Sequence, residues 1–172
     1  MKKITLKYGF IACLIVLGIP IGTSLFLGFG PESFDISAII GYSSILVAML
    51  LVYFAMRHFR DKENNGELYF MDGMKIGTLI SAMGGLAWGL YNLIFVVYIM
   101  PDFYEQFYAH DSGLAIGTPE FEKGFAEMMN ANGFWYTTFG GTLLMFLTVF
   151  LIGLAISIIS SLVLQRKTVQ TA

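Results

Sequence analysis

Residues 73–89 read GMKIGTLISAMGGLAWG and lie inside an apolar run that continues to Met100. Small residues recur in this run at every fourth position: Gly73, Gly77, Ser81, Gly85 and Gly89. Residues four apart on an α-helix form one inclined ridge, and a ridge of small side chains lets the backbone of a second helix approach closely. The pattern therefore predicts a membrane-spanning helix that packs tightly against another helix along this ridge.

The composition of the whole chain is typical of a helical membrane protein. The chain has 172 residues, of which 56% are hydrophobic and only 13% are charged, against about 25% charged residues in a typical soluble domain. Its mean hydropathy is +0.71. No basic stripe is present, so we expect no nucleic-acid partner. The single cysteine, Cys13, excludes an internal disulfide.

Four apolar stretches are each long enough to cross a bilayer, and they carry no charge apart from Lys75 at the mouth of the third. They cover residues 8–27, 36–56, 74–100 and 136–164. The sequence therefore predicts one all-α integral membrane domain over residues 1–172, a four-helix transmembrane bundle. A cleaved signal peptide is the alternative for the first stretch, but this stretch is long for a signal peptide and no A-x-A motif follows it.

The basic residues are unevenly divided between the two sides of this bundle. Nine of the ten Lys and Arg lie in the N-terminal lead, in the second loop with Lys75, or in the C-terminal tail, and only Lys123 lies on the other side. By the positive-inside rule, both termini are cytoplasmic and the loop at residues 101–135 is external.

The external loop contains one predicted helix. Thr118-Pro119-Glu120 is typical of a helix start, with a capping Thr and with Pro at the first position. Phe121 and Phe125 then share one face with Met128 and Met129, and Asn132-Gly133 ends the element. We predict an amphipathic helix whose apolar face caps the bundle; presentation of this face to a partner protein is the alternative.

No ionisable residue lies near the centre of any predicted span, which argues against a proton-coupled transporter or an intramembrane hydrolase. The polar residue of most interest is Asn92. Its amide could orient a substrate, or it could form an interhelical hydrogen bond that fixes packing, which is the interpretation we favour. On the fourth span, Gly153 and Ser157 repeat the small-residue spacing, so they are a predicted mate for the ridge.

The external acids offer one further candidate site. Asp102, Glu105 and His110 could hold a hard cation, since such cations prefer carboxylate ligands. Their spacing matches no recognised ligand motif, and the chain has no nucleophile elbow, P-loop, HExxH pair or dinucleotide fingerprint. The sequence therefore predicts no catalytic residue, no cofactor and no metal ligand; Asn92, Asp102 and His110 remain as a possible polar site.

Two motifs frame the third span: FMDGMKIG at residues 70–77 and YIMPDF at residues 98–103. Together with the four spans and the long third loop, they make the chain resemble the membrane family called domain of unknown function 4199. The resemblance covers residues 3–165. It implies a bacterial inner-membrane protein, and it brings no known activity, cofactor or catalytic residue.

The sequence thus predicts a multi-pass inner-membrane protein that is a non-enzymatic accessory or scaffold protein. Its partners would be the lipid bilayer and either a membrane protein or a second copy of the chain. The second hypothesis is a small transporter or channel subunit with a pathway near Asn92. The third is a membrane enzyme with an external acidic site. A continuous polar path between the helices would favour transport, whereas a dry, glycine-packed interior would favour the accessory role.

Overall fold

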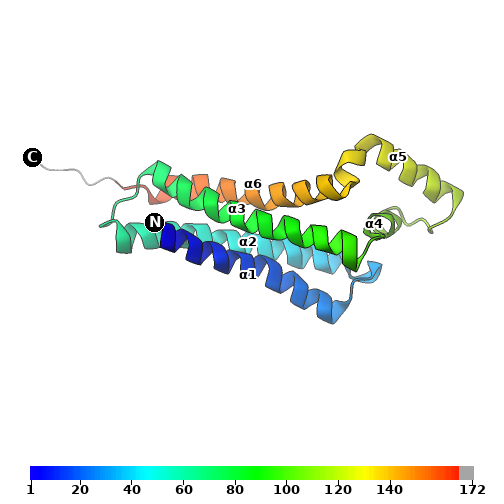
Figure 1. Ribbon diagram of the computed structural model, residues 1–172, viewed down its shortest axis with the longest axis horizontal. Helices are drawn as coiled ribbons and strands as arrows, with labels where there is room; N and C mark the ends of the chain where they lie inside the picture. Colours follow the sequence, from blue (N-terminus) through cyan, green and yellow to red (C-terminus); the bar gives the residue numbers. More distant parts are fainter. Residues whose placement is uncertain (167–172) are drawn as a thin grey trace, which may run out of the picture.

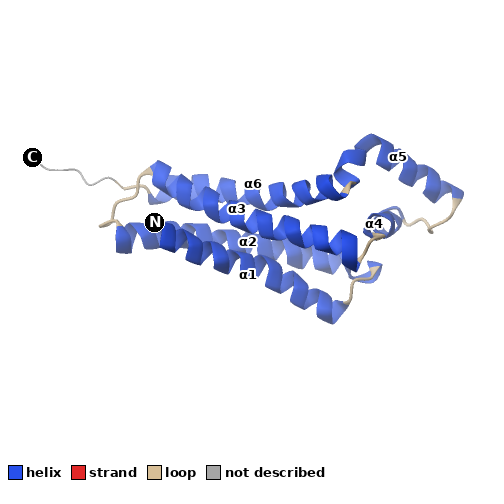
Figure 2. Ribbon diagram, viewed as in Figure 1, coloured by secondary structure: helices blue, strands red, loops and turns tan. Residues whose placement is uncertain are grey.

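The computed structural model of the chain describes residues 1–166, and the described part is helical apart from its loops (Figures 1 and 2). Four helices are long and apolar enough to cross a membrane. They are α1 (Lys2–Leu27), α2 (Phe34–His58), α3 (Phe70–Ile94) and α6 (Thr138–Leu164). The predicted all-α fold with four spanning helices is confirmed.

Two of the observed helices, α1 and α2, extend past the predicted spans because polar residues continue them, whereas α6 begins slightly later than the predicted fourth span. The basic lead forms the first turns of α1, which begins at Lys2. A short 3-10 turn, Pro31–Ser33, leads into α2. Two π-helical turns prolong α2 and α3, at Phe59–Glu63 and Phe95–Ile99. Such turns are uncommon and frequently mark functional regions of helices.

The bundle has two distinct ends (Figure 1). We call the end with the N-terminus and the α2–α3 connection the terminal end, and the end with α4 (Phe103–Ser112) and α5 (Pro119–Tyr136) the loop end. At the terminal end, the α2–α3 connection is tied to the end of α6. The amide of Leu68 donates to the Arg166 carbonyl at 3.1 Å, and the Arg166 amide donates back at 2.9 Å.

The terminal half of the bundle is filled by a close-packed apolar core. Met49, Val52 and Met56 of α2 are fully buried there, together with Ile76 and Ile80 of α3. These residues belong to one continuous cluster that also includes Val16 and Val149. Dispersion contacts and removal of apolar surface from water both stabilise such a core.

The small-residue ridge of α3 lies against α6, with small residues opposite small residues. Added Cβ atoms show how close the helices are: at Gly77 one would collide with the Ser157 side chain, and at Gly153 one would collide with the Ser81 hydroxyl. A Cβ atom added at Gly73 would lie 2.5 Å from the Ser161 hydroxyl. Helices that approach this closely leave no room for a side chain at the glycine positions.

Toward the loop end, the ridge meets the backbone of α6 as well as its side chains. A Cβ atom added at Gly85 would lie 2.9 Å from the Phe146 carbonyl oxygen, and one added at Gly89 would lie 3.0 Å from the Thr142 carbonyl oxygen. Two serines of the interface donate within their own helices, whereas the Ser161 hydroxyl donates to Met56 Sδ of α2 at 3.6 Å. Ser81 donates to the Gly77 carbonyl at 2.7 Å, and Ser157 donates to the Gly153 carbonyl at 2.6 Å. The α3–α6 contact is therefore satisfied without water.

The loop end differs from the sequence prediction in two ways. A second helix, α4, was not predicted in the loop at residues 101–135. The other helix, α5, begins as predicted: Pro119 is its first residue, and the Thr118 hydroxyl accepts from the Phe121 amide at 3.3 Å. Asn132 has a non-helical backbone (φ −129°, ψ 18°), but helix resumes after this kink and continues to Tyr136.

Phe121 and Phe125 were predicted to cap the four-helix bundle. In the structure their aromatic contacts are instead with Tyr108 of α4: the Tyr108 ring centroid lies 5.4 Å from that of Phe121 and 5.7 Å from that of Phe125. Phe121 is fully buried, although it lies outside the bundle core. The two loop helices thus cover each other, because α4 supplies an aromatic surface that the prediction lacked.

Candidate ligand-binding cavity

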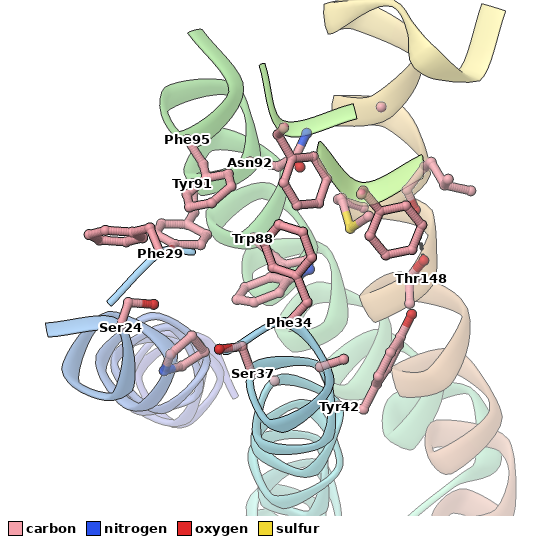
Figure 3. A pocket seen from close by; sticks show the side chains of 18 of the residues that line it. Ser24, Phe29, Phe34, Ser37, Tyr42, Trp88, Tyr91, Asn92, Phe95 and Thr148 are labelled. Carbon is pink, nitrogen blue, oxygen red and sulfur yellow. Dashed lines mark hydrogen bonds between the residues drawn. The ribbon is translucent and has the colours of Figure 1, made fainter. Parts of the chain in front are cut away.

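A cavity of about 650 Å³ lies among the long helices in the loop half of the bundle (Figure 3). Side chains from α1, α2, α3 and α6 line it, and α4 closes part of its outer end. Its volume falls in the range of small-molecule sites in proteins, about 300–1,000 Å³.

The cavity exists because the helices are held together unequally. The ridge keeps α3 against α6, and at the terminal end the core holds all four helices. In α1, however, Pro20 lines the cavity and cannot donate a backbone hydrogen bond to the preceding turn. Toward the loop end, α1 slopes away from α6 (Figure 1). The space that this divergence opens is bordered by Thr23 and Ser24 of α1.

Aromatic residues dominate the lining. They come from α3, from the start of α2 and from the loop helices, and they are Phe29, Phe34, Tyr42, Trp88, Tyr91, Phe95, Phe103, Tyr104, Phe107, Trp135 and Tyr136. Trp88 and Tyr91 stack with ring centroids 5.4 Å apart. No Asp, Glu, Lys, Arg or His is among the lining residues of this cavity within residues 1–166.

The cavity opens sideways between α2 and α6. Tyr42 of α2 is 57% exposed and Leu144 of α6 is 40% exposed, although both residues line the cavity. Thr148 borders the same opening, and its hydroxyl donates to the Leu144 carbonyl at 2.8 Å. This side of the bundle is one possible entry path, and the loop end is a second, because Phe107 and Trp135 also line the cavity and are 43% and 39% exposed.

Asn92 is the one strongly polar side chain buried in the lining. It is 9% exposed, and its Nδ2 has no hydrogen-bond partner among the described residues. The amide lies beside Gly141, where an added Cβ atom would be 3.5 Å from Nδ2 and would collide with the Tyr104 hydroxyl. The absence of a side chain at Gly141 thus lets the amide and the phenol lie next to one another.

Tyr104 is the second polar group at this point. Burial raises the pKa of its hydroxyl above the ordinary value. The Asn92 amide lowers this pKa by a smaller amount, through a contact that falls short of regular hydrogen-bond geometry. The hydroxyl therefore keeps its proton at neutral pH. Asn92 and Tyr104 together present N–H and O–H groups at one place in the lining.

The helix that supplies Tyr104 is held across the cavity mouth by Phe34. The Phe34 ring packs edge-on against Phe103, with ring centroids 5.7 Å apart, and against His110 at 5.6 Å. His110 Nε2 also lies 3.4 Å from the Asp35 carboxylate. These contacts join the start of α2 to α4.

The predicted polar site does not form one cluster. Asn92 lines the cavity, whereas Asp102 and His110 are not among its lining residues. Asp102 accepts a hydrogen bond from Gln106, and His110 faces Asp35. Within residues 1–166, no three His, Cys, Asp or Glu side chains lie close enough together to hold a metal ion.

The aromatic part of the site was not predicted from the sequence. Phe103, Tyr104 and Phe107 were treated as part of a loop, but they lie on α4 and line the cavity. Their spacing, at positions i, i+1 and i+4, was the available signal, since it places Phe103 and Phe107 on one helical face.

These features define the chain as a four-helix apolar bundle with one uncharged, aromatic cavity among its described residues. The chain belongs to the family described as "Protein of unknown function (DUF4199)", whose family model matches residues 7–166. No curated protein and no solved structure matches the chain.

Proposed function

We propose that this protein is a non-enzymatic accessory protein of the bacterial inner membrane, and that its cavity binds a neutral molecule dissolved in the bilayer. The observation that carries the proposal is the uncharged aromatic cavity that surrounds Asn92 and opens sideways. A lateral opening between two apolar helices would face lipid, so a bilayer molecule could enter without crossing water. The aromatic walls favour a ligand with a large apolar surface.

The packing of the terminal half favours an accessory role over transport. Transport would require a path through the cluster of Met49, Met56 and Ile80, all fully buried. Ser81 and Ser157 of the α3–α6 contact donate to carbonyls of their own helices, and Ser161 donates to Met56 Sδ, so these hydroxyls already have partners. A small transporter with a pathway near Asn92 remains the second candidate, because the cavity would supply one half of such a pathway.

An enzyme is the weakest of the three candidates. An external acidic active site would need Asp102, Glu105 and His110 to converge, whereas Asp102 and His110 have different partners in the structure.

A partner helix or a second copy of this chain would have to bind away from the small-residue ridge, because α6 already covers it. The outer face of α1 is the available alternative. Leu6, Phe10 and Leu14 recur there at every fourth residue and are exposed. We propose that this face lies against lipid or against a membrane partner.

The proposed orientation places both termini in the cytoplasm. Reporter fusions after Asn64 and after Ser112 should therefore report the cytoplasm and the exterior, respectively, since nine of the ten Lys and Arg lie on the first side. A phosphatase reporter and a fluorescent reporter at each position would make the assay reciprocal. The same location for both fusions would contradict the proposed topology.

Filling the cavity should remove the bound molecule. Gly41 is buried in the lining, and a Cβ atom added there would lie 3.8 Å from the Trp88 ring, so a leucine would enter the cavity beside the indole. We expect Gly41→Leu to lose at least about 90% of the bilayer molecules that remain bound after detergent extraction, as measured by native mass spectrometry. A loss of this size corresponds to about 1.4 kcal/mol in binding free energy.

Gly18→Leu is the matched control for this experiment. Gly18 also lies on a long apolar helix, but no atom lies within 4 Å of an added Cβ atom. Both variants gain the same helix propensity, so only the cavity distinguishes them. Equal retention of bilayer molecules by the two variants would contradict the proposed function.

A further inference from the structure

Asn92 is buried without a hydrogen-bond partner for its Nδ2 among the described residues. A buried amide that loses water and gains no partner destabilises the folded state. Asn92 lines the cavity (Figure 3), but neighbouring atoms cover its Nδ2, and the Tyr104 phenol is beside it. A molecule in the cavity could supply the missing acceptor once the amide or this phenol turns toward it.

We infer that Asn92 and Tyr104 form a recognition site for a neutral carbonyl group, such as an ester or quinone carbonyl, on an amphiphile held in the cavity. This inference rests on the proposed function and names the chemistry of its ligand. Its basis is the juxtaposition of the Asn92 amide and the Tyr104 hydroxyl beside Gly141. A carbonyl oxygen has two lone pairs, and it can therefore accept one hydrogen bond from each of these donors.

An ionised head group would find no opposite charge beside Asn92 and Tyr104, because the described lining residues are uncharged. No Lys, Arg or His lines the cavity within the described part of the chain, so nothing there would neutralise a phosphate or a carboxylate. Transfer of an uncompensated anion into an apolar site is strongly unfavourable. A hard cation is also disfavoured, because the lining contains no Asp or Glu among the described residues. The aromatic walls could hold a quaternary ammonium by cation–π contact, but that group offers no acceptor to the Asn92 amide. A neutral acceptor is the group that fits.

Apart from Asn92 and Tyr104, the lining is mostly aromatic, so it suits the hydrophobic part of a ligand that carries this carbonyl. Trp88 lies one helical turn before Asn92 on α3, and Phe95 lies one turn after Tyr91, in the π-helical turn that follows α3. Both give the cavity flat aromatic walls. Such walls pack well against a ring or against an acyl chain. Two sources share this chemistry: an ester-linked glycerolipid, and a quinone dissolved in the bilayer.

Binding of matched probes to the full-length protein in detergent micelles tests the inference. The ester probe is monoolein and its control is 1-O-oleyl glycerol, which has an ether in place of the ester. The quinone probe is decylubiquinone and its control is the reduced quinol. Apparent affinity is obtained from the rise in melting temperature with probe concentration. The only two tryptophans, Trp88 and Trp135, both line the cavity, so their fluorescence reports whether the glycerol probes enter it.

We expect wild-type protein to bind at least one carbonyl probe about tenfold more tightly than its control, the ratio that corresponds to loss of one to two hydrogen bonds. A preference for monoolein identifies a glycerolipid as the source, and a preference for decylubiquinone identifies a quinone. In Asn92→Leu, we expect this ratio to fall to about three, because the Tyr104 hydroxyl still donates, while the affinity for the control probe is retained. Tyr104→Phe should reduce the ratio about threefold.

The stability of the ligand-free variant separates recognition from packing. If Asn92 serves ligand recognition, Asn92→Leu should melt at the same temperature as wild type or higher, because an unpartnered polar group has been removed. If Asn92 only fixes packing, the variant should melt at a lower temperature. Should Asn92→Leu fail to fold, Tyr104→Phe decides, since retention of the full carbonyl preference in that variant would overturn the inference.

Different results would contradict the carbonyl site and the ligand-binding cavity. Equal binding of carbonyl and control probes by wild type would overturn the carbonyl site and leave the cavity as a binding site for apolar molecules. Absence of binding by all four probes, with unchanged tryptophan fluorescence, would overturn both the carbonyl site and the proposed ligand-binding function.

Discussion

Gly77→Leu is expected to lower the melting temperature of the detergent-solubilised protein and to reduce its abundance in membranes. Even a methyl group at this position would collide with the Ser157 side chain and lie 2.8 Å from Met56 Cε. A leucine must therefore push α6 away from α3 or displace buried core side chains. Overpacking of this kind costs about 1–3 kcal/mol in unfolding free energy, and occasionally more.

Gly85→Leu should have at least as large an effect. Its added Cβ atom would meet the Phe146 carbonyl oxygen at 2.9 Å, and backbone cannot move aside as a flexible side chain can. Thermal unfolding of both variants, followed by loss of monodisperse protein, measures the effect. Leu90→Ala is the control, because Leu90 lies on the same helix and is 57% exposed. Wild-type melting for both glycine variants would show that the ridge is not part of the core.

The second large effect is expected at the loop end. Phe121→Ser combined with Phe125→Ser should detach α5 from α4, because it removes the stacked Phe pair that packs on Tyr108. Truncation of a fully buried Phe costs about 3–5 kcal/mol. We expect protease to cleave within residues 101–135 of the double variant at concentrations that leave the wild-type loop intact.

The change in bundle melting temperature in this double variant distinguishes the two arrangements of α5: packed on α4, as observed, or packed on the four-helix bundle, as predicted. Since Phe121 and Phe125 lie outside the bundle core, the melting of the four long helices should change little. Glu122→Ser with Glu127→Ser is the control, because both glutamates lie on α5 and are exposed. A large fall in bundle stability, or a protease-resistant loop, would contradict the contacts described here.

The sequence contains most of the information for the fold because this information is local. An uncharged stretch of twenty residues must satisfy its own backbone hydrogen bonds in lipid, and only a helix does so within one segment. The ridge from Gly73 to Gly89 also follows from periodicity alone. Its contacts with Gly153 and Ser157 lie where the spacing of the fourth span suggested.

The cavity could not be predicted in the same way, because it depends on how helices distant in sequence diverge. Pro20 predicts a kink, but no local pattern states which neighbour the kinked helix leaves. Asn92 was a predicted candidate because it is a polar residue within an apolar span. Tyr104 was not, because it reaches the cavity only when α4 folds back over the bundle. The prediction also placed Phe121 on the bundle, since it lacked the aromatic partner that Tyr108 provides.

Photo-crosslinking from within the cavity in native membranes tests the central claim most directly. A benzophenone amino acid at Ser37, which lines the cavity, is compared with the same group at Leu46, which is exposed on the same helix outside it. Mass spectrometry of the crosslinked chain then identifies what each position contacts. We predict that position 37 captures a small set of neutral bilayer molecules, enriched over the bulk lipids captured at position 46. Identical lipid profiles at the two positions, or capture of another protein at position 37, would contradict a ligand-binding cavity.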